Sequence, residues 1–211
     1  MNQRTKVAIV DDETAILDSL QLSLTRKGFE VICFDSAKDF IAEIEAGLSL
    51  DCVVSDVKMR GMTGLALQRS LTQKKPSLPL IFITGHGDVD MAVTAVKAGA
   101  FDFIEKPIDD RRLAASIVDA ANSYRRTLAD QQELDSLRGR YRALSERQQQ
   151  VVTLAVEGLS NKEIAVQLGI SPRTVEHYRE SAMDRMQARS LAELVQMVVR
   201  LKMTPLESRR S

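Results

Sequence analysis

Residues 51–56 read Asp-Cys-Val-Val-Ser-Asp, a short apolar run that ends in an acid. A run of this length, rich in β-branched residues, predicts a strand that is buried on both faces. Three further runs have the same design: residues 7–12 end in an acid pair, residues 80–84 in a hydroxyl and residues 101–106 in a lysine. Because helix-like stretches separate the runs, the sequence predicts an α/β domain with a parallel sheet.

In such a sheet the carboxyl ends of the strands gather at one edge, and ligands bind there. We therefore expect five side chains to converge on one cleft: Asp11, Asp12, Asp56, Thr84 and Lys106. Carboxylates can hold a hard cation such as Mg²⁺, and Asp56 can serve either as a ligand or as a nucleophile that accepts a phosphoryl group. The lysine would neutralise phosphoryl charge and the threonine would donate a hydrogen bond. The alternative is that these are solvated loop residues. That explanation is favoured for any one of them alone, but not for five that stand at corresponding strand ends.

The predicted first domain covers residues 5–122 and consists of five strand–helix repeats. Helices are expected to follow the strands near residues 13–27, 36–47, 64–74, 88–98 and from 109 onward. Ser36 and Asp88 are expected to cap two of them. Five such units predict a flavodoxin-like, doubly wound, five-stranded parallel sheet with the first and third strands side by side.

The composition is that of an ordinary globular protein: 44% of the 211 residues are hydrophobic and the formal net charge is zero. Residues 1–122 carry 14 basic and 18 acidic side chains, whereas residues 123–211 carry 15 and 11, so the second half hints at a polyanionic partner. No apolar stretch approaches the roughly 18–20 residues that cross a membrane. Cys33 and Cys52 lie in apolar runs and are expected to be inert thiols. We therefore expect a cytoplasmic protein with no membrane partner.

The second half is helical by pattern. Residues 123–143 are expected to form a helical linker, which is a connector, a pairing seam or an extension of the fifth helix. A small all-α domain of four helices is predicted for residues 144–203, and a polar tail for residues 204–211. Its helices are expected to begin at the capping pairs Ser145/Gln148, Ser160/Glu163 and Ser190/Glu193 and at Ser171-Pro172. Two of them, joined by residues 169–171, predict a helix–turn–helix arrangement.

Residues 5–122 resemble a response-regulator receiver domain. The motifs that carry the resemblance are Asp11-Asp12, Asp56, Thr84-Gly85 and Lys106-Pro107, each at the end of its expected strand. Within that family, residues 84–89 and 100–107 are most similar to FixJ-like regulators. The resemblance implies that Asp56 is the phosphoacceptor, that a phosphohistidine on a sensor histidine kinase is the donor, and that the Lys106–Pro107 peptide is cis.

The same resemblance implies a Mg²⁺ site. Asp12, Asp56 and the backbone carbonyl of Lys58 would bind the ion, and Asp11 would act largely through a water molecule. Arg60 stands where the family usually has proline, and it can place a second cation near the cleft.

Thr84 and Phe103 form the switch that the resemblance implies. If Thr84 moves toward the phosphoryl group, it vacates space that Phe103 can occupy. That movement couples the cleft to the face made by the fourth helix, the fifth strand and the fifth helix, where two receivers would pair as a homodimer on phosphorylation. Many relatives have tyrosine at the position of Phe103; the phenylalanine cannot donate a hydroxyl bond when it turns inward.

Residues 159–179 resemble the LuxR-type (FixJ/NarL) DNA-binding domain, a likeness that covers about residues 140–203. Such helix–turn–helix proteins insert their recognition helix into the major groove. Asn161, Lys162, Arg173 and Arg179 suit phosphate contacts, which position the protein without specifying sequence. The exposed side of the recognition helix is expected to carry Arg173, Thr174, Glu176, His177, Arg179 and Glu180. Glu176, His177 and Glu180 lie where relatives read bases, although a solvated helix face is the alternative for each. Gln148 replaces a common glutamate, and beyond its place in the capping pair with Ser145 the sequence indicates no role for this replacement.

These observations predict a two-component response regulator that accepts a phosphoryl group and binds promoter DNA, as a dimer on an inverted repeat. Mg²⁺ is the expected cofactor, and RNA polymerase is a candidate further partner. The protein would be no enzyme beyond its own phosphorylation and dephosphorylation. A Mg²⁺-dependent phosphatase with an aspartyl-phosphate intermediate would need an acid two residues after Asp56, where Lys58 stands. A DNA-binding protein that ignores phosphorylation is the third reading, and the intact acids, threonine and lysine argue against it.

Overall fold

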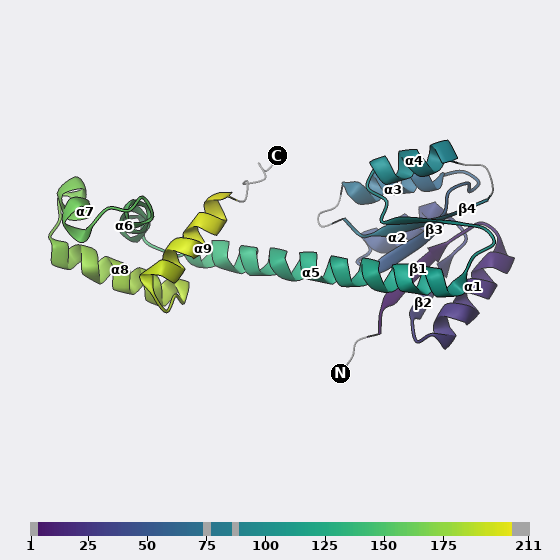
Figure 1. Cartoon of the computed structure of the whole chain (residues 1–211), viewed down its shortest axis with the longest axis horizontal. Coiled ribbons are helices and arrows are strands. Elements are labelled where there is room, and N and C mark those ends of the chain that lie inside the picture. The colour runs from purple at the N-terminus through teal and green to yellow at the C-terminus, as the bar shows by residue number, and fades with distance from the viewer. Residues whose placement is uncertain (1–3, 74–76, 86–88, 204–211) are drawn as a thin grey trace. The chain divides into compact units, whose positions relative to one another are not determined.

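The structure, a computed structural model, describes the backbone of residues 4–73, 77–85 and 89–203 (Figure 1). The chain divides into two compact units, Met1–Leu128 and Ala129–Ser211. The described residues do not include Asp88, the expected helix cap, the rest of residues 86–88 in the FixJ-like segment 84–89, or the expected tail at residues 204–211.

The first unit is built on five parallel strands in the order β2-β1-β3-β4-β5. The strands are β1 (Lys6–Val10), β2 (Glu30–Phe34), β3 (Cys52–Asp56), β4 (Leu80–Thr84) and β5 (Asp102–Glu105). The order confirms the predicted doubly wound sheet, because β1 and β3 are neighbours and Val10 lies opposite Ser55. Every residue of β3 and β4 is buried, as expected for strands covered on both faces.

Helices cover both faces of this sheet (Figure 1). They are α1 (Thr14–Arg26), α2 (Ala37–Glu45), α3 (Gly64–Thr72), α4 (Val89–Lys97) and the first part of α5 (Asp110–Arg142). Successive strand residues point to opposite faces, so Ile9 and Val54 pack in the core under α1 and α5. Val10 and Val53 pack in the core under α2, α3 and α4. Burying a side chain of this size stabilises the fold by about 1.5–3 kcal/mol.

Helix α3 begins directly against the end of β3. The Thr63 side chain caps it by accepting a hydrogen bond of 3.3 Å from the backbone N–H of Ala66. Gly64, the first residue of the helix, lies so close to the backbone of Asp56 and the ring of Phe82 that a methyl group would overlap both. The close approach of helix and strand, rather than an unusual φ, therefore requires glycine at this position.

Helix α5 runs without a break from Asp110 to Arg142. The predicted helical segment 123–143 is therefore an extension of the fifth helix, one of the alternatives that the sequence left open. Arg125 in α5 makes a bidentate ion pair with Asp51, with Nε–Oδ1 and Nη2–Oδ2 distances of 2.9 and 2.7 Å. Asp51 also accepts the backbone N–H of Lys6 at 2.8 Å. Charge-assisted bonds of this kind tie α5 to the amino ends of β1 and β3.

The second unit packs four helices with the last turns of α5. The four are α6 (Glu146–Val156), α7 (Asn161–Leu168), α8 (Pro172–Met186) and α9 (Leu191–Met203). One core cluster joins Leu137 of α5 to Val152 of α6 and Ala182 of α8. A second joins Val151 of α6 to Ile164 of α7 and Val175 of α8. The predicted small all-α domain is confirmed, and residues of α5 contribute to its core.

The helix ends of this unit follow the predicted capping chemistry. Complete capping boxes form at Ser145 and at Ser160, and Ser171 caps α8 with Pro172 in its first turn. The pair Ser190/Glu193 forms half of a capping box, because Ser190 Oγ accepts the backbone N–H of Glu193 at 3.2 Å. The Glu193 carboxylate accepts the backbone N–H of Arg189 at 2.7 Å instead of that of Ser190. Gly169 ends α7 with a φ of 65°, a left-handed conformation that glycine adopts without strain. The turn from α7 to α8 that the helix–turn–helix arrangement needs begins there.

Within the described residues, no helix combines the length and the apolar character that crossing a bilayer requires. Cys33 and Cys52 are both free thiols. Burial raises the pKa of Cys52, which keeps this thiol protonated and inert.

Two glycine-to-alanine substitutions should have opposite effects on stability. Gly64→Ala forces a methyl group into the Asp56 backbone and the Phe82 ring, so we expect a loss of about 1–3 kcal/mol in the free energy of unfolding. Gly139→Ala, within α5, meets nothing within 4 Å and should stabilise the helix by about 0.5–1 kcal/mol. Urea denaturation of the full chain measures both. Equal stability of Gly64→Ala and the wild type would contradict the close packing of α3 on β3.

Candidate functional site

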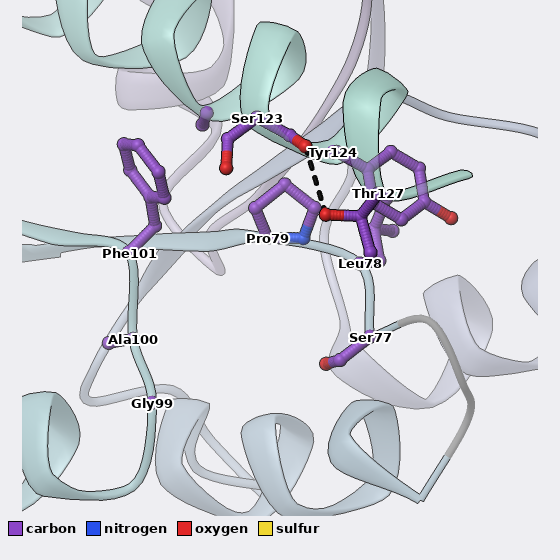
Figure 2. A pocket seen from close by; sticks show the side chains of 10 residues that line it. Ser77, Leu78, Pro79, Gly99, Ala100, Phe101, Ser123, Tyr124 and Thr127 are labelled. Carbon is purple, nitrogen blue, oxygen red and sulfur yellow. Dashed lines mark hydrogen bonds between the residues drawn. The ribbon is translucent and has the colours of Figure 1, made fainter. Parts of the chain in front are cut away.

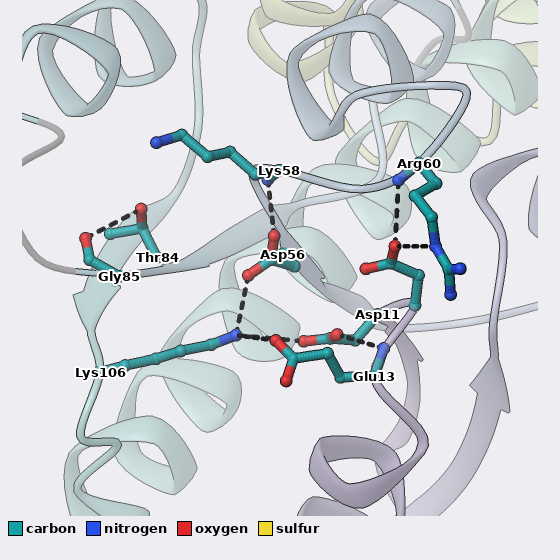
Figure 3. Close-up of polar contacts among 9 residues, drawn as sticks. Asp11, Glu13, Asp56, Lys58, Arg60, Thr84, Gly85 and Lys106 are labelled. Atoms are coloured by element: carbon teal, nitrogen blue, oxygen red, sulfur yellow. Dashed lines mark hydrogen bonds and ion pairs between the residues drawn. The ribbon is translucent and has the colours of Figure 1, made fainter.

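A cluster of acidic and basic side chains lies at the carboxyl edge of the sheet, where the sequence predicts the cleft (Figure 3). Strand pairing aligns the ends of the strands there, with Asp56 opposite Ile83 and Thr84 opposite Glu105. Five predicted site residues stand at or directly after those strand ends: Asp11, Asp12, Asp56, Thr84 and Lys106. The doubly wound topology therefore places the predicted side chains at one edge, as expected for strands that run parallel.

Lys106 brings three of the acids together. Its Nζ lies 3.0 Å from Asp56 Oδ1, 3.5 Å from Asp11 Oδ2 and 3.7 Å from Glu13 Oε1. Burial opposes the charge of Lys106, but its hydrogen bond to Asp56 and the charges of the acids outweigh that penalty and raise its pKa. The ammonium group is therefore firmly protonated. The peptide between Lys106 and Pro107 is cis, as the receiver resemblance implied.

The two buried acids of the cleft differ in their contacts. Asp11 is 2% exposed, and burial raises its pKa despite a hydrogen bond of 2.9 Å from the backbone N–H of Glu13 and the charge of Lys106. Asp56 is held at both oxygens, because Oδ1 pairs with Lys106 and Oδ2 accepts the backbone N–H of Lys58 at 2.6 Å. These contacts fix the orientation of the Asp56 carboxylate within the cleft.

Asp12 is paired with the loop that follows β3. Its Oδ2 accepts two hydrogen bonds from Arg60, at 3.1 Å from the backbone N–H and at 2.9 Å from Nε. The backbone and side-chain hydrogen bonds from Arg60 lower the pKa of Asp12. Arg60, which the sequence marked as a departure from the family pattern, thus supplies the second cation of the cleft.

The two predicted switch residues lie on neighbouring strands. Thr84, at the end of β4, is buried, and its hydroxyl donates to the carbonyl oxygen of Gly85 at 3.3 Å. Phe103 in β5 is half-buried and packs against the core under α2, α3 and α4. Its carbonyl oxygen accepts a hydrogen bond of 3.0 Å from Arg112 of α5. The strand pair β4–β5 places Phe82 opposite Phe103, so Thr84 lies further toward the cleft.

The helix–turn–helix face carries the predicted DNA-binding residues on α7 and α8. Lys162, Arg173, Glu176, His177 and Glu180 are exposed. The expectation of full exposure is wrong for Thr174 and Arg179, which are half-buried. The Thr174 hydroxyl lies 2.8 Å from that of Ser171, and the Arg179 guanidinium donates to Asn161. These bonds to the start of each helix draw the two side chains inward.

A separate cavity of about 370 Å³ lies on the first unit (Figure 2). Its lining includes Pro79 before β4, Phe101 before β5, and Ser123, Tyr124 and Thr127 of α5. No acidic or basic side chain lines it, so this cavity takes no part in the ionic chemistry of the cleft at the carboxyl edge.

Comparison with known proteins matches residues 7–118 to the response regulator receiver domain and residues 142–198 to the bacterial regulatory proteins of the luxR family. The transcriptional regulatory protein FixJ of Bradyrhizobium diazoefficiens is 41% identical over 96% of this chain and 98% of its own length. The FixJ protein of Rhizobium meliloti is 44% identical over 92% of this chain and 94% of its own. This chain belongs to the response-regulator family. It combines a receiver domain with a LuxR-type output domain.

Solved structures support the same family. The match to the response regulator StyR has 36% identity and a TM-score of 0.84, and it covers 94% of this chain and 100% of that chain. The match to full-length FixJ from B. japonicum has 41% identity and a TM-score of 0.59, and it covers 97% of this chain and 100% of that chain.

The donor atoms in the cleft of this response regulator are of the type that a hard divalent cation prefers. The carboxylates of Asp11, Asp12 and Asp56 and the carbonyl of Lys58 supply oxygen alone, as Mg²⁺ prefers. In the part of the chain that the structure describes, no three acidic, histidine or cysteine side chains already converge closely enough to hold a metal. Mg²⁺ needs only one or two carboxylates, because water and phosphate oxygens complete its shell.

Two residues of the response regulator acquire roles that the sequence did not indicate. Glu13 contacts Lys106, and only its place directly after the acid pair could have drawn notice. Gln148 is buried; its Oε1 accepts the backbone N–H of Ser145 at 2.8 Å, as the predicted capping pair requires, and its Nε2 makes an additional bond by donating to Ser181 Oγ at 2.7 Å. It therefore links the start of α6 to α8. A glutamate could not donate the second bond when ionised, and no sequence signal identifies Ser181 as the partner.

The burial of Asp11 predicts a pH-dependent stability. Because its pKa is raised above the ordinary 3.8, the folded state binds this proton more readily than the unfolded chain. The contribution of Asp11 to the free energy of unfolding therefore falls as pH rises from 3.8 through the raised pKa. Asp11→Asn removes that charge and should raise Tm by a few degrees at pH 7 in low salt without Mg²⁺.

The gain should shrink toward pH 4, where Asp11 of the wild type takes up its proton. Asp18→Asn, at an exposed position of α1, is the matched control and should leave Tm nearly unchanged. Calorimetric scans of the three proteins across pH measure the difference. A lower Tm of Asp11→Asn at pH 7 would show that the ion pair outweighs burial.

Proposed function

We propose that this response regulator is a phosphorylation-controlled transcription factor in which Asp56 accepts a phosphoryl group from a sensor histidine kinase. The observation that carries the proposal is the setting of the Asp56 carboxylate. It lies at the end of β3, with Lys106 at one oxygen and the Lys58 N–H at the other. The carboxylate is thereby oriented for attack, and a cation stands beside the place where phosphoryl charge would arrive.

The transfer forms one bond and breaks one. A carboxylate oxygen of Asp56 attacks phosphorus, the new O–P bond gives an acyl phosphate, and the P–N bond of the phosphohistidine breaks. The imidazole leaves with the electron pair of that bond. Phosphoryl transfer depends on in-line positioning and charge neutralisation. Lys106 supplies a fixed positive charge, and the Lys58 N–H can donate to oxygen once the carboxylate is esterified.

Mg²⁺ is the proposed cofactor, held by Asp12, Asp56 and the carbonyl of Lys58, with Asp11 acting through a water molecule. When bound, it neutralises charge on the phosphoryl oxygens and on the crowded acids. Asp12 and Asp56 approach the cleft from β1 and β3, which are adjacent strands. Two carboxylates from adjacent strand ends and one carbonyl would be the protein's share of the oxygen ligands, and oxygens of water and phosphate would complete the set.

The switch is proposed to act through Thr84 and Phe103. A phosphoryl group brings about 1.5–2 negative charges, which attract the Thr84 hydroxyl away from the carbonyl of Gly85. Phe103, half-buried one strand away, then turns into the vacated space. The surface of α4, β5 and α5 changes as a result and pairs two copies of the chain.

The second unit is proposed to bind promoter DNA through α8, which enters the major groove. Lys162 and Arg173 are exposed and suit phosphate contacts, and the Asn161–Arg179 pair lies on the same two helices. Glu176 and Glu180 can accept hydrogen bonds from base amino groups such as cytosine N4. A dimer would read an inverted repeat, because its two-fold symmetry mirrors that of the site.

The proposed partners are a sensor histidine kinase, promoter DNA, RNA polymerase and a second copy of the chain, in the cytoplasm. The only proposed catalysis is the protein's own phosphorylation and dephosphorylation. A phosphatase of the aspartyl-phosphate type needs an acid two residues after its nucleophile to protonate the leaving group. Here Lys58 occupies that position. Its exposed side chain is a cation and cannot act as that carboxylic acid.

Asp56→Asn should abolish phosphorylation by acetyl phosphate and Mg²⁺, because an amide cannot form the acyl phosphate. Intact-mass spectrometry measures the added phosphoryl group, and promoter footprinting and molar mass on the same sample measure DNA binding and dimer formation. Asp18→Asn, which removes an exposed acid of α1, is the control and should be phosphorylated normally.

The proposal would be refuted if Asp56→Asn were phosphorylated as fully as the wild type and its DNA binding were still stimulated by the phosphodonor. Equal DNA affinity of the wild type with and without phosphodonor would instead favour a regulator that ignores its receiver. Turnover of small phosphate esters would favour a phosphatase.

Arg173→Glu should weaken binding to all DNA sequences alike, because a phosphate contact carries no base information. The slope of log K against log salt should become shallower by about one unit, since one fewer phosphate is neutralised. Arg69→Glu makes the same charge change on the exposed surface of α3 in the first unit and should leave both quantities unchanged. Weaker binding to one operator alone would show that Arg173 reads bases.

A further inference from the structure

The two cations of the cleft divide the acids between them. Lys106 pairs with Asp11, Glu13 and Asp56 (Figure 3). Arg60 pairs with Asp12. Arg60 thus contacts Asp12, the acid after β1 that is the proposed metal ligand. Any cation that binds Asp12 at the same oxygen must therefore displace Arg60 or share that oxygen with it.

The Arg60 contact has two separable parts. One is the backbone N–H, at 3.1 Å from Asp12 Oδ2, which a proline at this position would lack. The other is the side-chain Nε, at 2.9 Å from the same oxygen, which brings a positive charge. Both donors use Oδ2, so together they occupy the lone pairs through which that oxygen would bind a metal.

The side chain of Arg60 can leave without a penalty in packing. It is 88% exposed, whereas that of Asp12 is 19% exposed. Gly61, with a φ of 79°, follows in the same loop, and its left-handed backbone marks a turn directly after the contact. An ion pair this exposed is weak and salt-sensitive. It can therefore compete with a metal ion without preventing its binding.

We propose that Arg60 is a positioning residue: a tethered counter-cation on Asp12 that Mg²⁺ must displace, and that thereby lowers the affinity of the cleft for Mg²⁺. This inference rests on the proposed function, since it assumes that Asp12 is a metal ligand. Arg60 sets the Mg²⁺ concentration at which the receiver becomes competent for phosphorylation. Once the ion is bound, Arg60 has no part in the transfer itself.

The direct test measures metal affinity of the full chain without phosphodonor. Mn²⁺, which shares the octahedral oxygen chemistry of Mg²⁺, is the probe, and the electron paramagnetic resonance signal of free Mn²⁺ reports its binding; Mg²⁺ competes it off. Arg60→Ala should bind both ions about two- to fivefold more tightly at low salt, the range that an exposed ion pair is worth. The difference should shrink at high salt.

Three matched variants separate the parts of the contact. Arg60→Pro removes the backbone donor as well and should bind at least as tightly as Arg60→Ala. Arg60→Lys keeps the charge without Nε and should lie between the wild type and Arg60→Ala. Arg69→Ala removes an exposed arginine from α3 and should bind as the wild type does. Unchanged or weaker binding by Arg60→Ala overturns the proposal, as does equal tightening by Arg69→Ala, which would make net charge the cause.

A second measurement distinguishes this inference from the proposed function. With acetyl phosphate as donor, the Mg²⁺ concentration for half-maximal phosphorylation should fall about two- to fivefold in Arg60→Ala, with the same rate at saturating Mg²⁺. A lower rate at saturation would show that Arg60 clamps the phosphoryl group, which overturns the displacement role. Absence of phosphorylation in every variant, the wild type included, would contradict the proposed function, while the Mn²⁺ affinities would still decide the role of Arg60.

Discussion

The ammonium group of Lys106 lies among three carboxylates at the carboxyl edge of the sheet, and it makes their close approach tolerable. Like charges in a partly buried site repel one another and lose hydration, and a paired cation offsets both costs. Lys106 can reach Asp56 and Asp11 because β5 ends in register with β4, which in turn pairs with β3. The chemistry of the site therefore depends on the strand order of the fold.

The cleft is only partly neutralised by its cations, and this suits it to bind first a divalent cation and then a phosphoryl group. Two cations, Lys106 and Arg60, face four acids, so a negative charge remains that attracts Mg²⁺. They differ in mobility, because the Lys106 side chain is 22% exposed and the Arg60 side chain 88%. One is a fixed part of the site, whereas the other can be exchanged for a metal ion at little cost in packing.

Much of this arrangement could be predicted from the sequence, because it follows from periodicity and from the geometry of parallel sheets. Apolar runs such as residues 51–56 identify the strands, and the rule that their carboxyl ends meet places Asp56 beside Asp11. Capping residues such as Ser145 and Ser160 identify helix starts for a similarly local reason.

The parts that could not be predicted depend on contacts between residues distant in the chain or on loop conformation. Arg60 reaches Asp12 across 48 residues through a loop whose path no periodicity specifies. Gln148 bonds to Ser181, 33 residues away. Arg179 lies on the predicted exposed face of α8, but a donor bond to Asn161 of α7 draws it inward. Residue spacing along one helix identifies its exposed face but not the neighbours that cover it.

The Asp51–Arg125 ion pair has a mechanical consequence for the strand that presents the phosphoacceptor. β3 is five residues long, its start adjoins the Asp51 anchor on α5, and its last residue is held by Lys106. A strand clamped by charge at both tips cannot slide along its neighbours unless both clamps break. β3 thus serves as a stationary frame for the molecule. Any displacement set off by new charge at Asp56 has to be absorbed by the segments around it, so the signal would travel outward through loops and helices while the strand stays still.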